Sequence, residues 1–525
     1  ISPHVVRLIY VGRPGDGSVA IGVVYAAVFQ QYATRLLSFQ PALNFEDKVG
    51  RRYYNVLAPH VLGYVGFIQE EQCAAYEERG YRCDELIGQA GLEQWGESYL
   101  AGTRGGELNL WTATGNFVLQ VAAKEAEPAQ SIYTTLDRDL QAAVQDALEE
   151  AYQVGGPTWV QEAGGAAVVV LDVNSGAVLA MASFPHFDPN ALHPFNGHPY
   201  AVNGNYLADV LNQPLRPLLN RAAQSAYPAG SVFKVVTATA GLESGLFPLD
   251  YIHNSTGIWC ELGPTDCRND WNEDGFGPIN LCQALTASSN TFFYQVGYDL
   301  GNEEMGLLAE EAREYGYGAA TGIEIDEQSG SIPDPFGLTS DGRQFSVPDN
   351  VNLAIGQGDV LVTPLQVALM MATVANGGTV YEPHLVDRIG LIGEEPSVVT
   401  QPQVIREMSL DPELLATIRE CLNLVTSDPV LGTAEWRLGS LPIDVAGKTG
   451  TAQVSGTLQP NAWFAGFAPY DEPEIAVAVL VENGGQGSAV AAPIFRRVVE
   501  AYLGLPLSRY PNDWTDPDEF DFVGD

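Results

Sequence analysis

Apolar residues recur at helical and strand spacings along most of the chain. After residue 131, one polar stretch carries them at every fourth position, at Leu140, Val144, Leu148 and Tyr152. This spacing predicts an amphipathic helix. The apolar runs 166–173 and 177–182, separated by Asn-Ser-Gly, predict a hairpin. A second strand pair, 463–467 and 475–481, precedes an expected helix over 492–503, so we expect an antiparallel sheet built from both ends of this domain.

The first part of the chain follows a different pattern. Short alternating apolar runs and many glycines predict strands and turns around a few helices, and so a separate, extended domain over 1–130. The polar stretch 122–130 is the expected boundary with a second domain over 131–505. After the second domain, the segment 506–525 is rich in proline and acidic residues, which predicts a loose tail.

The charge balance narrows the possible functions. Among 525 residues, 25 are basic and 65 acidic, and the formal net charge of −40 would repel nucleic acid rather than bind it. The apolar share of 46% is typical of folded protein. The longest apolar candidate, 19–29, is too short to span a bilayer. Because the sequence starts at Ile1 rather than Met, we expect a membrane anchor upstream of it.

The cysteines leave two interpretations open. Two pairs are close in sequence, Cys73 with Cys83 and Cys260 with Cys267. Each is either a disulfide of an exported protein or a pair of reduced side chains. Cys282 and Cys421 lie in apolar helical patterns and are predicted to be core residues. Neither the cysteines nor the seven histidines have the spacing of metal ligands.

The first candidate for chemistry is the segment 227–234, Tyr-Pro-Ala-Gly-Ser-Val-Phe-Lys, at the start of an apolar helical run. Ser231 would lie at the helix N-terminus, with Lys234 on the same face and free backbone N–H groups pointing at the group that the serine attacks. A lysine activates a serine only if burial or a nearby cation keeps the amine neutral. Alone, this S-x-x-K pattern is more typical of a capping serine beside an exposed lysine.

A second candidate ends another helical pattern. In the segment Thr-Ala-Ser-Ser-Asn over 286–290, Ser288 is suited to relay a proton and Asn290 to hold a substrate amide. A polar helix terminus is the simpler explanation when this segment is taken alone.

The third candidate is the run 445–452, which contains Lys448, Thr449, Gly450 and Thr451. The lysine and the two hydroxyls would bind a carboxylate, and the glycine would let a substrate strand approach the backbone closely. A hairpin with a surface lysine is the alternative.

Taken in order, S-x-x-K, S-x-N and K-T-G resemble the signature set of the penicillin-binding proteins and serine β-lactamases. The segment 352–358, Asn-Leu-Ala-Ile-Gly-Gln-Gly, resembles the one that precedes K-T-G in the larger members, and the likeness extends over about 131–505. Segments 60–66 and 88–93 look like the pedestal of the class B, monofunctional enzymes. Residues 1–50 depart from the family, because they lack its arginine-rich entrance to the pedestal.

The resemblance implies an α+β fold. The penicillin-binding transpeptidase domain would have a central antiparallel sheet with helices on both faces and an all-helical part. An extended N-terminal pedestal domain of the dimerisation type, divergent over 1–50, would precede it.

The resemblance also implies a peptidoglycan D,D-transpeptidase without a cofactor. Ser231 would attack the carbonyl between the terminal D-alanines of a stem peptide, with Lys234 as base and with Ser288 and Lys448 as a proton path. The backbone N–H groups of Ser231 and Thr451 would form the oxyanion hole. Penicillins would acylate the same serine.

Substrate binding would fall to the other motif residues, Asn290, Thr449, Gly450 and Thr451. The expected partners are stem peptides, β-lactams and a membrane glycosyltransferase, and the expected location is extracytoplasmic. A serine β-lactamase and a non-catalytic penicillin sensor or divisome scaffold are the alternatives. The N-terminal domain and the long interval between Asn290 and Lys448 argue against the first, and the intact motifs argue against the second.

One acidic loop matches part of a calcium-binding pattern. Residues 270–275, Asp-Trp-Asn-Glu-Asp-Gly, have the opening D-x-N-x-D-G of such a loop. The twelfth position holds Leu281 instead of the glutamate that binds with both oxygens. An acidic turn is therefore the better interpretation, and no metal site is expected.

Overall fold

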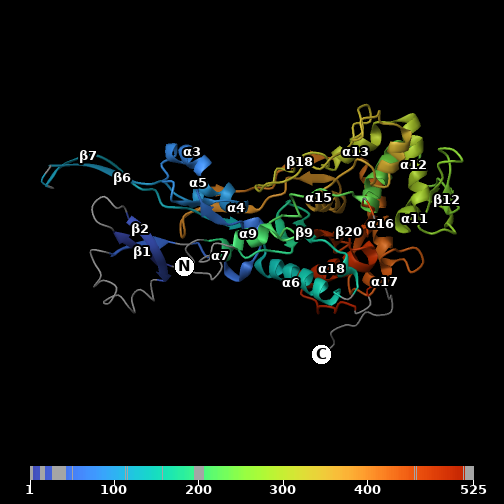
Figure 1. The fold of residues 1–525 in the computed structure, drawn as a ribbon. Helices are drawn as coiled ribbons and strands as arrows, with labels where there is room; N and C mark the ends of the chain where they lie inside the picture. The colour runs from blue at the N-terminus through green and yellow to red at the C-terminus, as the bar shows by residue number, and fades with distance from the viewer. Residues whose placement is uncertain are drawn as a thin grey trace. The chain divides into compact units, whose positions relative to one another are not determined.

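The chain forms two compact units in the computed structural model (Figure 1). The structure describes residues 51–112, 114, 116–156, 158–193, 206–454, 456, 458–511 and 514, and the backbone of 4–11, 18–25 and 43–49. The first unit comprises 1–133, 186–218 and 388–399, and the second 134–185, 219–387 and 400–525. Two segments from the expected second domain, 186–218 and 388–399, thus cluster with the N-terminal part, because contacts rather than chain order define a unit.

The first unit consists of small sheets and short helices. Its three N-terminal strands pair in the order β2-β1-β3: β1 (His4–Val11), β2 (Ser18–Tyr25) and β3 (Leu43–Val49). Two further antiparallel pairs follow: β4 (Val65–Phe67) with β5 (Leu86–Gly88), and β6 (Gly106–Trp111) with β7 (Phe117–Lys124). A fourth small sheet has the order β17-β16-β8, from β8 (Ser131–Thr134), β16 (Val386–Gly390) and β17 (Val398–Val399). The helices are α2 (Pro59–Leu62), α3 (Cys73–Glu78), α4 (Gly91–Trp95), α5 (Glu97–Leu100), α7 (Pro189–Leu192) and α9 (Tyr206–Leu211).

A five-stranded antiparallel sheet is the centre of the second unit. Its order is β10-β9-β21-β20-β19, from β9 (Ala166–Asp172), β10 (Val178–Phe184), β19 (Ala446–Ala452), β20 (Asn461–Ala468) and β21 (Ile475–Val481). Both hairpins predicted from the sequence are present in it. Every residue of β20 and β21 is buried, so helices must cover both faces of the sheet.

Two long helices, α6 (Arg138–Val154) and α18 (Gly487–Tyr502), cover one face of this sheet, and α15 (Pro364–Ala375) lies against the other (Figure 1). The α6 helix begins where the Asp137 carboxylate accepts the backbone N–H groups of Asp139 and Leu140. Its predicted apolar stripe packs into the main core. The α18 helix starts five residues before the predicted 492, because Gly487 and Pro493 do not look helical in sequence.

The remaining helices of the second unit form its helical part. They are α10 (Lys234–Glu243), α11 (Leu281–Thr286), α12 (Asn290–Glu303), α13 (Leu307–Glu314), α14 (Val347–Leu353), α16 (Pro412–Ser427) and α17 (Glu435–Leu438). Three two-stranded ribbons accompany them: β11 (His253–Ser255) with β14 (Gly277–Ile279), β12 (Ile258–Trp259) with β13 (Arg268–Asn269), and β15 (Thr379–Tyr381) with β18 (Val404–Glu407). Because α10 is buried along nearly its whole length, side chains at its N-terminal end are withdrawn from bulk water.

All six cysteines are paired. The two close pairs, Cys73–Cys83 and Cys260–Cys267, are disulfides. Cys282 on α11 and Cys421 on α16 form a third disulfide, with their Cα atoms 5.0 Å apart. The prediction that these two were only core residues is therefore incomplete: Cys421 is fully buried, but its partner lies 139 positions away in the sequence.

The first part of the predicted loose tail is packed instead. Tyr510 and Trp514 are buried, with their rings stacked at 5.0 Å, and Trp514 also meets Trp159 edge-on. The Arg437 side chain donates to the Trp514 carbonyl at 2.7 Å. These apolar contacts correct the prediction for 506–511 and Trp514, while the other tail residues lie outside the described part. Among the described residues, no helix is long and apolar enough to cross a membrane.

Candidate active site

Ser231 lies in a tight turn that leads directly into α10. The turn is the short 3-10 helix Gly230–Phe233, and Gly230 adopts a φ of +54°. Its N–H donates to the carbonyl of Gly356 at 2.8 Å. A Cβ at Gly356 would lie 2.2 Å from the Gly230 carbonyl oxygen, so the segment 352–358 supports the serine turn through a contact that only glycine allows.

Lys234 is the first residue of α10 and is fully buried. Its Nζ donates to the Ser288 carbonyl at 2.7 Å and to Asn290 Oδ1 at 2.7 Å, and Ser288 Oγ is 3.4 Å away. Burial lowers the pKa of Lys234 to about 7, although the carboxylate of Asp270 acts to raise it. The structure thus brings the second sequence motif onto the first.

Lys448 occupies a comparable environment on β19. Its side chain is fully buried, and Nζ donates to the carbonyl of Thr449 at 3.1 Å. Burial holds the pKa of this amine well below its usual range, and the positive charge of Lys234 lowers it further. The site therefore holds two buried lysines with lowered pKa values, and the charge of Lys234 acts on Lys448.

The strand that carries Lys448 is the edge strand of the large sheet. It passes close to the serine turn, since a Cβ at Gly450 would lie 2.8 Å from the Cβ of Trp463 and 3.0 Å from Val232. Thr451 is exposed, whereas Thr449 is largely buried and shares a hydrogen bond of 2.7 Å with the hydroxyl of Thr433. The edge of β19 beside the serine turn, where Thr451 is exposed, is a suitable position for an added peptide strand.

The chain before the serine is fixed by a network that sequence reasoning did not identify. Glu482, directly after β21, accepts hydrogen bonds from Arg221 at 3.0 Å, from the Tyr227 hydroxyl at 2.8 Å and from the backbone N–H of Gly165 at 2.6 Å. The indole of Trp463 also donates to the carbonyl of Pro228 at 3.1 Å. The motif gave no signal for Glu482, because this residue lies about 250 positions away in the sequence.

The acidic loop 270–275 forms a turn. The Asn272 side chain donates to the Gly275 carbonyl at 2.9 Å, and its Oδ1 accepts the backbone N–H of Asp274. Asp270 is buried and directed away from the loop, toward α12. Among the described residues, no group of potential metal ligands includes this loop. The structure therefore agrees with an acidic turn rather than with the opening of a calcium loop.

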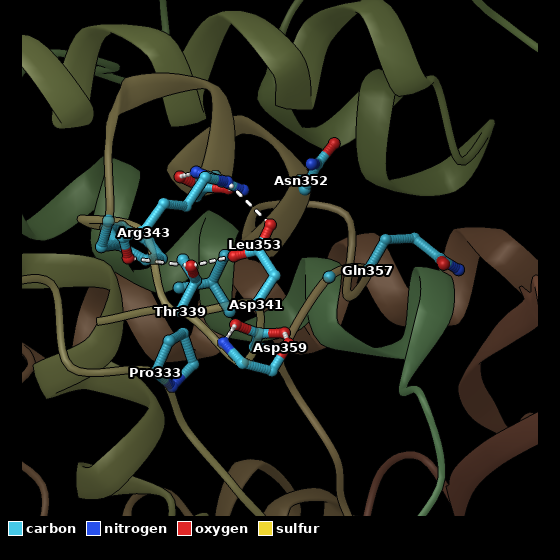
Figure 2. A pocket seen from close by; sticks show the side chains of 12 residues that line it. Pro333, Thr339, Asp341, Arg343, Asn352, Leu353, Gln357 and Asp359 are labelled. Atoms are coloured by element: carbon cyan, nitrogen blue, oxygen red, sulfur yellow. Dashed lines mark hydrogen bonds and ion pairs between the residues drawn. The ribbon is translucent and has the colours of Figure 1, made fainter. Parts of the chain in front are cut away.

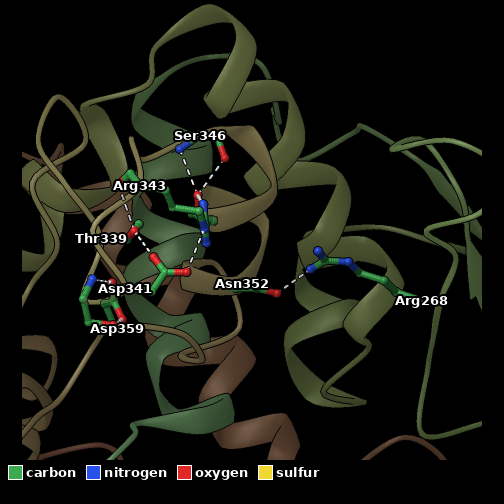
Figure 3. Close-up of polar contacts among 9 residues, drawn as sticks. Arg268, Thr339, Asp341, Arg343, Ser346, Asn352 and Asp359 are labelled. Carbon is green, nitrogen blue, oxygen red and sulfur yellow. Dashed lines mark hydrogen bonds and ion pairs between the residues drawn. The ribbon is translucent and has the colours of Figure 1, made fainter.

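A polar cavity of about 150 Å³ lies beside the segment 352–358 (Figure 2). Its charged groups bind one another: Arg343 donates to both carboxylate oxygens of Asp349 at 2.5 and 2.6 Å, and Asp359 accepts from the backbone and hydroxyl of Ser340. Figure 3 shows these contacts together with a hydrogen bond from Arg268 to Asn352. The arrangement stabilises the chain that supports the serine turn.

Comparison with known proteins agrees with the geometry. The family description "Penicillin binding protein transpeptidase domain" matches residues 166–500, and "Penicillin-binding Protein dimerisation domain" matches 24–134. Peptidoglycan D,D-transpeptidase MrdA of Haemophilus influenzae is 31% identical over 491 residues, which cover 89% of this chain and 71% of the relative.

Two solved structures are similar over most of the chain. One, described as "Structural coordination of polymerization and crosslinking by a peptidoglycan synthase complex", is 31% identical, with a TM-score of 0.79 and coverage of 95% of this chain and 87% of the other. The other is penicillin-binding protein A of Mycobacterium tuberculosis as its penicillin G acyl-enzyme complex. It is 30% identical, with a TM-score of 0.60 and coverage of 72% and 82%.

These likenesses decide between the interpretations left open by the sequence. The transpeptidase match covers more than half of the chain, and the dimerisation match covers the part that a stand-alone β-lactamase would not need. The relative from Haemophilus influenzae is named for the cross-linking enzyme rather than for a sensor. The chain therefore belongs to the penicillin-binding proteins with a transpeptidase domain, as a class B member and a serine-type peptidoglycan D,D-transpeptidase.

Proposed function

We propose that Ser231 is the nucleophile of this transpeptidase and that Lys234 is the base that activates it. The supporting observation is the environment of Lys234, which is enclosed and whose hydrogen bonds within the described part of the chain are to neutral oxygens. With a pKa of about 7, a large fraction of the amine is neutral near neutral pH and can accept a proton.

Acylation then follows from these positions. The Ser231 hydroxyl transfers its proton to Lys234 as its oxygen bonds to the carbonyl carbon between the two terminal D-alanines of a stem peptide. Collapse of the tetrahedral intermediate breaks the amide C–N bond. The proton passes through Ser288 to the nitrogen of the departing D-alanine, which leaves an ester on the serine.

The second half-reaction reverses the proton path. An amine of a neighbouring stem peptide attacks the ester carbonyl and expels the serine oxygen. That oxygen recovers a proton from the attacking amine through Ser288 and Lys234, and the new amide is the cross-link. Penicillins enter at the first half and remain as a stable ester.

The other motif residues would bind the donor peptide. The peptide would pair with β19, the edge strand of the sheet, where Gly450 permits a close approach, and Asn290 would orient its amide. Thr449 and Thr451 would bind the terminal carboxylate beside the amine of Lys448. The backbone N–H groups of Ser231 and Thr451 would stabilise the oxyanion, a contribution typically worth about 3 kcal/mol of barrier.

We further propose that the protein works outside the cytoplasm beside a membrane glycosyltransferase. The three disulfides favour an oxidising compartment. The similar solved chain comes from a peptidoglycan synthase complex, which supports a polymerase partner.

The decisive test is labelling with a fluorescent penicillin. Wild-type protein should form an adduct that a mass spectrum places on the peptide containing Ser231, and Ser231→Ala should form none while keeping its thermal melting temperature. Ser244→Ala, at the far end of α10, is the matched control and should label normally. Labelling of Ser231→Ala at the wild-type rate would overturn the assignment.

The lifetime of the adduct separates the candidate activities. An adduct that persists for hours supports a transpeptidase, whereas release within seconds would indicate a β-lactamase. No adduct at all would indicate a scaffold. Lys448→Ala should slow acylation more for substrates with a free terminal carboxylate than for amidated analogues, and equal losses would refute the carboxylate role.

A further inference from the structure

The four residues 288–291, at the start of α12, contact two buried ionisable side chains in turn, Lys234 and Asp270. Ser288 and Asn290 contact the amine of Lys234. Ser289 Oγ donates to Asp270 Oδ2 at 2.8 Å, and Thr291 donates to the same oxygen through both its N–H and its hydroxyl, at 3.0 Å each. Lys234 thus bonds to residues 288 and 290 of the turn, and Asp270 bonds to residues 289 and 291.

The Asp270 carboxylate is enclosed. The side chain is 4% exposed, and Ser289 and Thr291 are fully buried. Its second oxygen accepts the backbone N–H of Trp271 at 2.8 Å. Four hydrogen bonds therefore saturate a buried anion at the N-terminus of a fourteen-residue helix, where the helix dipole also stabilises negative charge.

The turn 288–291, to which Asp270 is hydrogen-bonded, has an unusual backbone conformation. Ser288 adopts a φ of +54°, a left-handed conformation that a residue with a side chain rarely takes without support from its surroundings. This conformation directs both the Ser288 carbonyl and the Asn290 side chain at one amine. The bonds from Asp270 to Ser289 and Thr291, both of which follow Ser288, can maintain this conformation.

A second connection joins Asp270 to the serine turn. Arg268, two residues earlier, donates to Asn352 Oδ1 at 2.5 Å (Figure 3). Its guanidinium lies over the ring of Tyr294. Asn352 begins the segment whose Gly356 carbonyl accepts the N–H of Gly230. The strand β13 and its loop therefore contact both halves of the site.

The charged groups around the site are few. Asp270, from the loop after β13, and Lys448, from β19, are the titratable groups among the described residues whose charges act on Lys234 or are acted on by it. Asp270 also acts on His253 and Tyr294. Burial lowers the pKa of His253, so this side chain is neutral where Lys234 titrates.

We propose that Asp270 is a positioning residue of the transpeptidase, whose carboxylate holds the turn 288–291 against Lys234 and supplies the counter-charge of that buried lysine. The proposal rests on the role proposed above for Lys234. It assigns Asp270 no contact with substrate.

The test compares three variants by the rate of penicillin acylation between pH 5.5 and 9. Asp270→Asn removes the charge and keeps the shape, so acylation should fall about tenfold or more as the turn loosens. Without its counter-charge, Lys234 should lose its proton more easily. The acylation rate rises with pH as Lys234 loses its proton, and this rising limb of the pH profile should move by about one pH unit toward acid.

Ser289→Ala separates the two parts of the proposal. It removes one bond to Asp270 and keeps the charge, so acylation should fall about tenfold, as expected for the loss of one hydrogen bond to a charged carboxylate, while the rising limb of the pH profile stays where it is in the wild type. Asp274→Asn, the same substitution at an exposed position of the same loop, should match wild type in rate and profile. Thermal melting confirms folding.

Two outcomes would overturn the proposal. In the first, Asp270→Asn is folded, its pH profile rises at the same pH as that of the wild type, and its acylation rate equals that of Asp274→Asn. In the second, Ser289→Ala acylates at the wild-type rate, and this variant decides the question if Asp270→Asn does not fold. Failure of the proposed function is distinguishable, because wild type itself would then not label at Ser231 or would have no limb near pH 7.

Discussion

Replacing Lys234 by methionine should make the protein more stable and inactive. The lysine is fully buried and a methionine fills nearly the same volume without charge or donor. The side chain should therefore be a catalytic group that the fold tolerates at a cost, rather than one that stabilises it.

The cost follows from the pKa. The folded-state pKa of about 7 lies below the unfolded value of 10.5, so the unfolded chain binds more protons between pH 7 and 10.5, and stability rises with pH through this window. At 1.36 kcal/mol per pH unit, keeping the amine in its site costs about 4 kcal/mol at pH 7. Methionine cannot make the hydrogen bonds of Lys234 to Ser288 and Asn290, and their loss should cost the variant about 2 to 3 kcal/mol of the stability gained by removing the amine. Lys234→Met should thus gain about 1 to 2 kcal/mol at pH 7.

The assay is urea unfolding at pH 7 and pH 9, with fluorescent penicillin as the activity readout. From pH 7 to 9 the wild type should gain about 2 kcal/mol that Lys234→Met does not gain, so the advantage of the variant should vanish. Lys124→Met, at an exposed position on β7, controls for the substitution and should change stability by less than about 0.5 kcal/mol at either pH. A difference between Lys234→Met and wild type that stays constant with pH would refute the reasoning, because it would mean that the buried lysine keeps an ordinary pKa.

Three other perturbations have expected outcomes. Gly356→Ala should reduce penicillin acylation at least about tenfold by pushing on Gly230, while Gly377→Ala, which has a similar positive φ but open space, should leave the acylation rate unchanged. Replacing Cys282 and Cys421 together by serine should lower the free energy of unfolding by about 2 to 5 kcal/mol, because this disulfide closes a loop of 139 residues, as urea unfolding can measure. Trp514→Ala should cost about 3 to 5 kcal/mol in the same assay and leave the acylation rate of the folded fraction unchanged.

The sequence sufficed to predict what local pattern and short motifs encode. The two hairpins of the central sheet and the helix over 138–154 follow from spacing alone, since each is a continuous segment with one buried face. The position of Ser231 and Lys234 at the start of a helix also follows, because a glycine turn precedes an apolar run.

Contacts between distant segments could not be predicted. The sequence predicts only an acidic turn over 270–275, and the fold shows that the Asp270 carboxylate is directed inward to Thr291. The pairing of Cys282 with Cys421 depends on how α11 packs against α16, on which spacing carries no information. The prediction of a loose tail was wrong for its described part, because the composition is that of a loose segment although the buried Trp514 holds the chain in place.

The chemistry of the site depends as much on which groups are kept out as on which are present. The chain has 65 acidic residues, yet Asp270 is the one carboxylate in the described part whose charge acts on Lys234. A carboxylate paired directly with that amine would hold it protonated and unable to accept the serine proton. The amine is bonded instead to a carbonyl and an amide oxygen, which are neutral acceptors that orient it and raise its pKa less than a carboxylate would. Asp270 is separated from Lys234 by the turn that it holds, so its charge favours the protonated lysine only partly, which suits a group that must both take and return a proton in each turnover.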